Sequence, residues 1–411
     1  MVPVTVSSGV KQMTEVKYIN NDPQYGVKYD FRKLRKAYKK LNCPPDVYDP
    51  CTAPLEEAKY FVLLSERNIG KTTNWLLFGM LMNKFYSSII QYVRQTDDEI
   101  MPKALRDLFK TILEHDYIEK ITEGQYNSVV YKSRRYYYSL VDESGQVLDV
   151  APEHFMFCCS VEKGQDLKSS YNSPRGDIII FDEFVRKFFY KNEFISFCDL
   201  TKTIIRGRRS PFIIMAANNI DPYSPYYNEL EIFDDVQALK IGDNKLIQTS
   251  MGTKIYLEKI GAVLEKKRKN TIINQLFYGF RNPQLSAITG EGDWSIKNYQ
   301  HIPEPEEGEE EPYVITRRLY ILYSTKLVRF DVVKHQRLGL CLYAHWATKT
   351  YKDSIIMTVE PRYDSRYVKG LGSGKLLKLM KKATEQNRIY YATNDIGAFV
   401  ENYVKNVIRT V

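Results

Sequence analysis

Residues Leu63–Thr73 read LLSERNIGKTT, and this run ends in Gly70-Lys71-Thr72. Such an ending is typical of the phosphate-binding pattern G-x-x-x-x-G-K-[ST], in which a loop leads into a helix, the lysine reaches the β- and γ-phosphates and the hydroxyl holds Mg²⁺. Ser65 stands where the pattern begins with glycine, and a small serine fits there if its φ is negative. Asn68 is a residue that tolerates a left-handed backbone. The run therefore predicts a nucleotide-phosphate site, against the alternative of a chance Gly-Lys-Thr at the start of a helix.

Three apolar runs of the chain end in polar residues. Tyr60–Leu64 leads into the loop, Asp177–Phe181 ends at Asp182-Glu183, and Pro211–Ala217 ends at Asn218. Short apolar runs that alternate with helical segments predict a largely parallel α/β sheet. Ligands bind at the carboxyl ends of the strands in such sheets. We therefore expect the three polar endings to meet at one site.

Each polar ending has a role in ATP hydrolysis. Asp182 would hold Mg²⁺, and Glu183 would polarise the attacking water. A glutamate directly after the aspartate favours the ATPase class that inserts a strand between the loop strand and the acidic strand. Asn218 would sense the γ-phosphate, and the alternative for all three is a strand end capped by solvated polar side chains. Arg206 either supplies an arginine finger to a neighbouring subunit or belongs to a basic surface turn.

Composition narrows the class of protein. The chain has 411 residues, 44% of them hydrophobic, with 32 Tyr and 19 Phe, which is enough for two or three domains with cores. Lys and Arg outnumber Asp and Glu by 59 to 50, and the net charge of +9 suits a polyanionic partner. No apolar run reaches the roughly 18 residues of a membrane span, and the N-terminus lacks the pattern of a signal peptide. We expect a cytosolic protein without a membrane partner.

Two competing chemistries find little support in the sequence. The six cysteines form no CxxC pair, so we expect structural thiols rather than a zinc site. Neither Asn83-Lys84 nor Asn244-Lys245 continues as the guanine-selecting N-K-x-D, which favours ATP over GTP. The glycine-rich run Gly370–Lys375 is followed by Leu376 where a phosphate loop needs a hydroxyl, and we interpret it as a turn.

Two basic segments each have two interpretations. Phe31–Lys40 predicts a basic helix, which either has a solvated face or contacts phosphates or a neighbouring subunit. Tyr131–Tyr138 interleaves lysine and arginine with tyrosine. That mixture suits nucleic acid, and it equally suits a half-buried strand with alternating side chains.

Taken in order, these segments resemble the DNA encapsidation proteins, or packaging ATPases, of small short-tailed bacteriophages, which are relatives of large terminase subunits. The loop of that family runs roughly Ala-Arg-Gly-x-Gly-Lys-[Ser/Thr], and Arg67 is the residue that points to it. The segments that carry the resemblance are Glu66–Thr72, Tyr92–Arg94, Ser133–Tyr137, Ser160 with Glu162-Lys163, Lys168-Ser169, Ile180–Arg186, Thr203–Arg208 and Asn218-Asn219.

The resemblance implies a motor that drives double-stranded DNA into a preformed procapsid with Mg-ATP. It implies a homo-oligomeric ring, commonly a pentamer, on the portal (connector) protein at the portal vertex in the host cytoplasm, with a structural packaging RNA in some members. Arg206 matches the trans-acting arginine finger, and Lys168 matches a lysine at the subunit interface. The expected catalytic residues are Lys71, Asp182, Glu183, Arg206, Asn218 and Lys168. The expected nucleotide-binding residues are Ser65, Arg67, Asn68, Ile69, Gly70, Lys71, Thr72 and Thr73, with Thr72 and Asp182 on the metal.

The expected fold class is α/β: a P-loop NTPase of the additional-strand, catalytic-glutamate type, followed by a smaller α/β domain that resembles a vestigial RNase H-like nuclease. The expected boundaries are an N-terminal extension at 1–55, the motor domain at 56–235, a linker region with an acidic loop at 236–312, and the second domain at 313–411. The alternatives are a helicase-like ATPase, a terminase with an active nuclease domain, and a basic scaffold protein with a degenerate loop.

Overall fold

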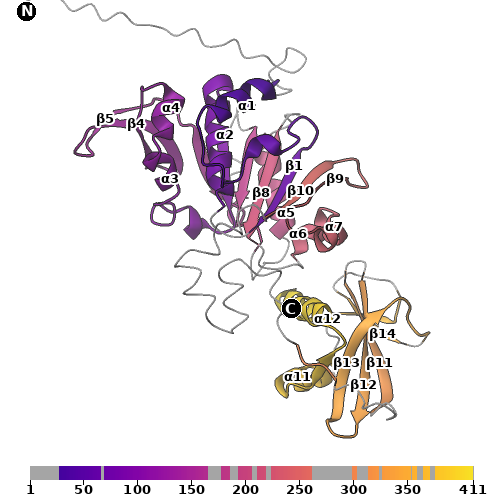
Figure 1. Cartoon of the computed structure of the whole chain (residues 1–411). Helices are drawn as coiled ribbons and strands as arrows, with labels where there is room; N and C mark the ends of the chain where they lie inside the picture. The colour runs from indigo at the N-terminus through magenta and orange to yellow at the C-terminus, as the bar shows by residue number, and fades with distance from the viewer. Residues whose placement is uncertain are drawn as a thin grey trace, which may run out of the picture. The chain divides into compact units, whose positions relative to one another are not determined.

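The computed structural model describes residues 27–65, 69–164, 177–185, 193–205, 211–218, 224–261, 299–302, 313–323, 326–352, 354–358, 364–370 and 375–410. These residues fall into two compact units, which are coloured indigo to pink and orange to yellow (Figure 1). The first holds the described residues up to 185, 193–218 and 234–261, and the second holds 224–233 and the residues from 299 on. Each unit has its own sheet flanked by helices, so the chain has two α/β domains.

A ten-stranded sheet forms the centre of the first unit, in the order β3-β4-β6-β2-β7-β8-β1-β10-β9 with β5 paired to β4. The strands from β6 to β10 in that order are all parallel to one another, as the apolar runs predicted. The strands are β1 (Tyr60–Ser65), β2 (Ile90–Arg94), β3 (Ser128–Lys132), β4 (Arg135–Val141), β5 (Val147–Val150), β6 (Met156–Ser160), β7 (Ile178–Asp182), β8 (Phe212–Asn218), β9 (Asn244–Gln248) and β10 (Lys254–Ile260).

Strand β8 lies between β1 and β7, so one strand separates the loop strand from the acidic strand. This is the strand order that the Asp182-Glu183 pair predicted. The register places Ser65 beside Asn218 and Asp182 beside Ala216. Because the three strands are parallel, their polar carboxyl ends meet at one edge of the sheet.

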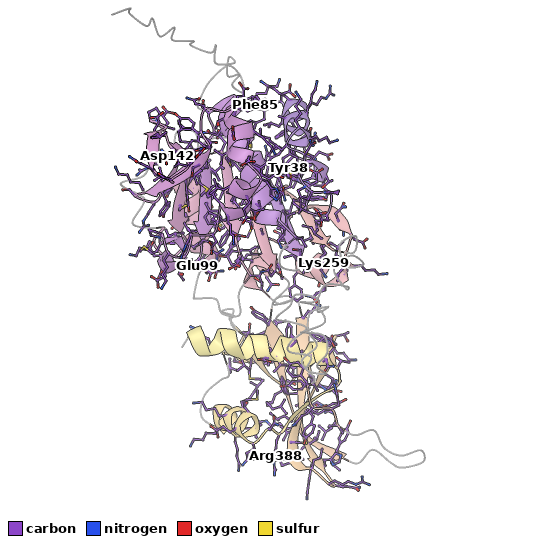
Figure 2. The ribbon with its side chains drawn as sticks, turned by 60° about the vertical axis from the view of Figure 1, so that its left-hand side comes forward. Tyr38, Phe85, Glu99, Asp142, Lys259 and Arg388 are labelled. Atoms are coloured by element: carbon purple, nitrogen blue, oxygen red, sulfur yellow. The ribbon has the colours of Figure 1, made fainter. Side chains whose placement is uncertain are left out.

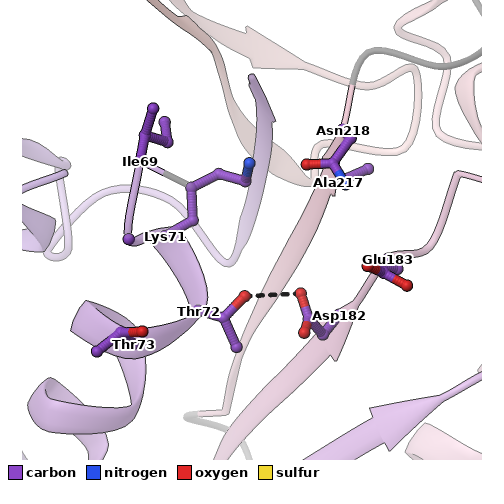
Figure 3. A pocket seen from close by; sticks show the side chains of 9 residues that line it. Ile69, Lys71, Thr72, Thr73, Asp182, Glu183, Ala217 and Asn218 are labelled. Atoms are coloured by element: carbon purple, nitrogen blue, oxygen red, sulfur yellow. Dashed lines mark hydrogen bonds between the residues drawn. The ribbon is translucent and has the colours of Figure 1, made fainter. Parts of the chain in front are cut away.

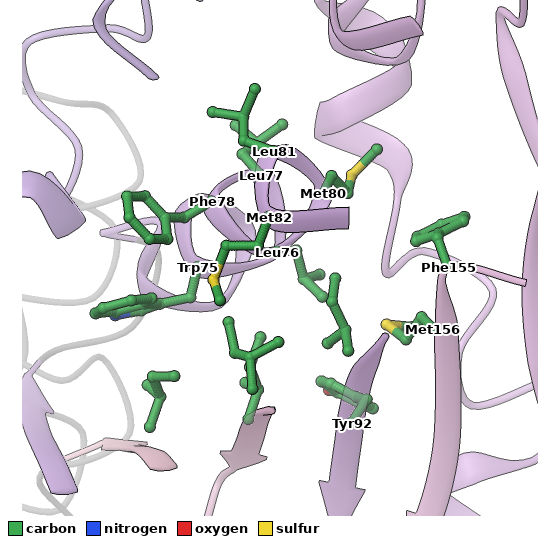
Figure 4. Close-up of a cluster of buried hydrophobic side chains, with 14 of the residues drawn as sticks. Trp75, Leu76, Leu77, Phe78, Met80, Leu81, Met82, Tyr92, Phe155 and Met156 are labelled. Carbon is green, nitrogen blue, oxygen red and sulfur yellow. The ribbon is translucent and has the colours of Figure 1, made fainter. Parts of the chain in front are cut away.

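Helix α2 follows β1 and is apolar on all sides. Every side chain from Trp75 to Met82, apart from glycine, is 3% exposed or less, because α2 lies between the sheet and α1, η3, α3 and α4 (Figure 4). Each large apolar side chain buried here stabilises the fold by about 2 kcal/mol. The helical elements are α1 (Phe31–Lys39), η3 (Pro50–Thr52), α2 (Lys71–Tyr86), η4 (Asp97–Ile100), α3 (Lys110–Glu114), α4 (Tyr117–Thr122), α5 (Glu193–Ile205), α6 (Pro225–Glu229) and α7 (Phe233–Ala238).

The opposite face of the sheet is covered by α5. Side chains alternate between the faces of a strand, and in β7 Ile178 and Ile180 belong to the core under α2. Phe181 points the other way and stacks on Phe197 of α5, with ring centroids 4.7 Å apart. The site at the end of β7 therefore has packed helices on both sides.

The first unit takes in more of the chain than the expected motor domain at 56–235. Part of the expected N-terminal extension packs into its core, where Leu34, Tyr38 and Tyr48 are 4% exposed or less. Part of the expected linker region also belongs to it, because β10 pairs with β1 along its whole length and β9 pairs with β10. The sheet continues to Ile260.

The second unit has a six-stranded sheet in the order β15-β14-β11-β12-β13-β16. Strands β11, β12 and β13 form an antiparallel meander, and the outer strands add to it in parallel. Helices α11 (Lys375–Glu385) and α12 (Asn394–Thr410) lie on one side of this sheet (Figure 1). Its strands are β11 (Tyr313–Tyr323), β12 (Lys326–His335), β13 (Gly339–Ala347), β14 (Ile355–Thr358), β15 (Tyr367–Lys369) and β16 (Ile389–Tyr391), and α6 also falls in this unit.

Two acidic residues of this second unit, Asp331 and Asp364, are engaged in ion pairs. Asp331 is buried in β12 and accepts from Arg329 at 2.9 Å, with His345 Nε2 at the same distance from its carboxylate. Asp364 is paired with Arg366 at 2.6 Å. Within the described parts of the chain, no group of three or more His, Cys, Asp or Glu is arranged to hold a metal ion.

No helix among the described residues is both long and apolar enough to cross a membrane.

Candidate functional site

A pocket of about 380 Å³ opens where the carboxyl ends of β1, β7 and β8 meet the start of α2. Figure 3 shows its side chains on the first turn of α2 and the residue before it, and at the ends of β7 and β8. The volume is in the range of small-molecule sites. Nine residues line it: Ile69, Gly70, Lys71, Thr72, Thr73, Asp182, Glu183, Ala217 and Asn218. Five of the predicted loop residues and all three predicted strand endings are therefore together.

Gly70 begins α2 in a left-handed conformation, with φ of 77°. A Cβ at this position would lie 2.8 Å from Asn74 Nδ2 and 3.2 Å from Val47 Cβ. Glycine is needed here both for its φ and for the close approach of these two side chains. Ser65 differs, because it lies in extended backbone inside β1 and pairs with Asn218 and Ile260. The position that opens the sequence pattern does not need glycine in this chain.

We expect Gly70→Ala to destabilise the protein by about 2–4 kcal/mol and to weaken ATP binding, because strain and overlap add. Gly124→Ala is the matched control. Gly124 has φ of 80°, yet an added Cβ there would meet nothing within 4 Å. Gly124→Ala should therefore lose only the stability that backbone strain costs, about 1–2 kcal/mol. Denaturant unfolding measures both variants. Equal losses of stability would contradict the close packing at Gly70.

Lys71 extends from the first turn of α2 toward the end of β1 (Figure 3). Its side chain is buried, and Nζ donates a hydrogen bond to the Ser65 hydroxyl. The ammonium group therefore lies beside the end of β1 and close to the N-terminus of α2, whose dipole favours anions. This position fits the phosphate-binding role predicted for Lys71.

Thr72 and Asp182 face each other across the pocket. The Thr72 hydroxyl donates to Asp182 Oδ1 at 2.8 Å (Figure 3). Tyr92 donates its buried hydroxyl to the other carboxylate oxygen, Oδ2, also at 2.8 Å. A hydroxyl and a carboxylate at this separation form the oxygen donor set that Mg²⁺ takes beside nucleotide phosphates. These residues therefore fit the predicted metal ion.

Glu183 lies in the left-handed region, with φ of 54°, which is uncommon for a residue other than glycine. In a regular strand, consecutive side chains point to opposite faces. The backbone turn at Glu183 breaks that alternation, so that Asp182 and Glu183 both line the pocket. Strain of this kind is found at functional sites, and here it accompanies two carboxylates that line the same pocket.

Arg94 is a site residue that we did not predict from the sequence. It ends β2, the strand next to β7, and its guanidinium contacts Asp182 at 3.3 Å and Glu183 at 2.6 Å. Burial alone would lower the pKa of Arg94, but Tyr92 and the two carboxylates raise it above its usual value. The available signal was a basic residue at the carboxyl end of a strand that runs parallel to the acidic one.

The other predicted site residues divide into two groups. Asn218 ends β8 between the loop and the acids and lines the pocket, as do Ile69 and Thr73. The remaining four, Arg67, Asn68, Lys168 and Arg206, lie outside the described residues.

The basic and aromatic hairpin of β3 and β4 directs three of its four tyrosines inward. Tyr131 donates to the carbonyl of Ile100 at 2.6 Å, and Tyr136 donates to that of Leu105 at 3.2 Å. Tyr138 stacks on Phe155 at 4.2 Å. These contacts favour the half-buried strand over a row of bases stacked on exposed rings. Asp142 lies in the turn that joins β4 to β5 (Figure 2).

Two solved structures with a similar fold are described as phage packaging motors. The structure described as "The Phi-28 gp11 DNA packaging Motor" matches with a TM-score of 0.54 at 13% identity, over 90% of this chain and 99% of that chain. The chain shares the fold of this packaging-motor protein. A second structure, "The bacteriophage Phi-29 viral genome packaging motor assembly", matches with a TM-score of 0.50 at 16% identity, over 87% of this chain and 99% of that one.

The resemblance predicted from the sequence is confirmed at the level of the fold, because both matching chains are covered almost completely. No protein-family model and no curated protein matches the sequence.

Proposed function

We propose that this protein is an ATP-driven motor that translocates double-stranded viral DNA into a preformed procapsid. The observation that carries the proposal is the single pocket in which Lys71 and Thr72 meet Asp182 and Glu183. A phosphate-binding lysine, a metal-binding hydroxyl and aspartate, and a glutamate beside them are the parts that ATP hydrolysis requires. The fold shared with two packaging-motor structures supports DNA packaging as the work that hydrolysis drives.

Each side chain of the pocket has a separate task in this proposal. Lys71 and the N–H groups at the start of α2 bind the phosphates. Glu183 polarises the attacking water, and Asn218 contacts the γ-phosphate from the end of β8. Thr72 and Asp182 hold Mg²⁺, which neutralises negative charge on the β- and γ-phosphates when it is bound.

The proposed assembly is a homo-oligomeric ring, with five copies expected, on the portal protein of the procapsid in the host cytoplasm. In such a ring Arg206 reaches the ATP of the neighbouring copy, and Lys168 lies at the same interface. Residues 313–411 carry more than twice as many basic as acidic residues, which suits contact with DNA or a structural RNA. In this part of the chain Asp331 and Asp364 form ion pairs with Arg329 and Arg366. Their charges are neutralised, which supports a nuclease-like domain without nuclease activity.

The test is the rate of ATP hydrolysis with and without duplex DNA and the portal ring. We expect duplex DNA to stimulate hydrolysis, and we expect Lys71→Ala to abolish binding of labelled ATP because the phosphates lose their cation. Lys375→Ala is the matched control, since Lys375 also follows a glycine at the start of a helix but belongs to the other unit. Stimulation by single strands alone would favour a helicase-like ATPase. Unchanged ATP binding in Lys71→Ala would reject the site.

A further inference from the structure

The segment before β1 contacts the loop that leads into α2. The backbone N–H of Tyr48 donates to the carbonyl of Ile69 at 2.8 Å. The carbonyl of Gly70 accepts twice from Asn74, from Nδ2 at 2.8 Å and from the backbone N–H at 2.9 Å. Tyr38 of α1 donates its hydroxyl to Asn74 Oδ1 at 2.6 Å. Two consecutive carbonyls of the loop are thus anchored by residues 27–55, directly or through Asn74.

Anchoring a carbonyl fixes the direction of the next N–H. The peptide unit is planar and trans, so its C=O and N–H point in opposite directions. Holding the carbonyl of Ile69 therefore orients the N–H of Gly70, and holding that of Gly70 orients the N–H of Lys71. Consecutive N–H groups that point the same way form an anion-binding nest, and both residues line the pocket.

The hydrogen bonds that join Tyr38, Asn74 and Gly70 can be arranged in only one way. A carbonyl oxygen can only accept, so the amide nitrogen of Asn74 must face Gly70 and its oxygen must face Tyr38, which must donate. Asn74 is 3% exposed and Tyr38 is 4% exposed, so water cannot replace either partner. Burial raises the pKa of Tyr38 well above its usual value, which keeps the hydroxyl protonated as the donor.

We propose that Tyr38 and Asn74 are positioning residues of the nucleotide site, which aim the N–H of Gly70 and Lys71 at the phosphates. The inference rests on the proposed function, and it gives the segment at 27–55 a role in ATP binding. Neither residue lines the pocket. Their effect is to hold the loop in its binding conformation before ATP arrives, which raises affinity by reducing the ordering that binding requires.

A matched control separates this role from simple packing of α1 on α2. Tyr86 OH accepts from the N–H of Asp30 at 2.9 Å, so it too links these helices through a tyrosine hydroxyl. It does so at the far end of α2, beside Phe85, away from Tyr38 (Figure 2). Tyr38→Phe and Tyr86→Phe each remove one hydroxyl and one hydrogen bond between the same two elements. Only Tyr38→Phe frees the side-chain amide of Asn74, so that the Gly70 carbonyl keeps the backbone N–H of Asn74 but is held less firmly by Nδ2.

The first measurement is steady-state ATP hydrolysis by the full chain. We expect Tyr38→Phe to raise KM for ATP by about 3- to 10-fold with kcat nearly unchanged, because positioning of the empty loop is lost. Tyr86→Phe is expected to leave both constants as in the wild type while lowering Tm by a similar amount. Equal KM values for the two variants would overturn the proposal.

The second measurement is hydrogen–deuterium exchange of the amides at 69–74 without nucleotide. Tyr38→Phe should speed exchange there, and Tyr86→Phe should not. Exchange that is the same in both variants would overturn the positioning role even if ATP binds. A wild-type chain that binds no ATP would instead reject the proposed function, and the exchange comparison would still decide whether Tyr38 orders the loop.

Discussion

Glu183→Gln is expected to reduce ATP hydrolysis by about 10²- to 10⁴-fold, the usual contribution of a general base. Glutamine keeps the size of the side chain and an oxygen that accepts from Arg94, but it cannot take a proton from water. Since Lys71, Thr72 and Asp182 are untouched, ATP affinity should stay within about three-fold of the wild type. Single-turnover hydrolysis and direct binding of labelled ATP measure the two quantities.

Glu99→Gln is the control that the structure offers for this experiment. Glu99 and Glu183 contact the same guanidinium nitrogen of Arg94, at 3.0 and 2.6 Å. Only Glu183 lines the pocket. The two variants therefore remove one negative charge beside the same arginine, and only one of them should lose hydrolysis. Full activity in Glu183→Gln would assign the water to another residue.

The parallel sheet and its site edge could be predicted because each strand that forms them is short, apolar and followed by polar residues. Burial on both faces allows no alternation in β7 or β8, so the pattern identifies a central strand. The position of β8 between β1 and β7 followed from Asp182-Glu183 rather than from periodicity. Local pattern alone does not give strand order.

Two parts of the fold were not evident in the sequence. Strand β10 exposes Lys254 at its start, and its basic residues look like a linker although Tyr256 is buried against β1. Residues 27–55 contain several prolines and look like an addition, although Leu34 and Tyr38 lie four residues apart and bury one face of α1. In both cases the burial depends on partners that are distant in the sequence.

Arg94 shows what the sequence alone does not predict about the site. It lies 88 residues before Asp182, and it meets the carboxylates only because β2 pairs with β7 in a register that places Val93 beside Phe181. That register is a tertiary property. A single sequence gives the charge of Arg94 but not its partners.

The role proposed for Arg206 predicts the other large effect, because a cation that stabilises the transition state of phosphoryl transfer contributes about 10³- to 10⁵-fold to the rate. Among the nine residues of the described pocket, Lys71 is the one cation, while Arg94 is occupied by Asp182 and Glu183. The pocket is therefore consistent with a second cation that comes from a neighbouring copy. Arg206→Ala is expected to abolish hydrolysis while leaving ATP binding intact.

Mixed rings decide whether Arg206 acts in trans. An Arg206→Ala copy keeps its own Lys71, and a Lys71→Ala copy keeps Arg206, so the two together complete a site wherever they are neighbours in the right order. An equal mixture should recover roughly a quarter of the wild-type rate if the sites act independently. The control replaces the Lys71→Ala copy with the double variant Lys71→Ala/Arg206→Ala, which supplies neither group and should give no recovery. A mixture no more active than its separate components would place Arg206 outside the neighbouring site.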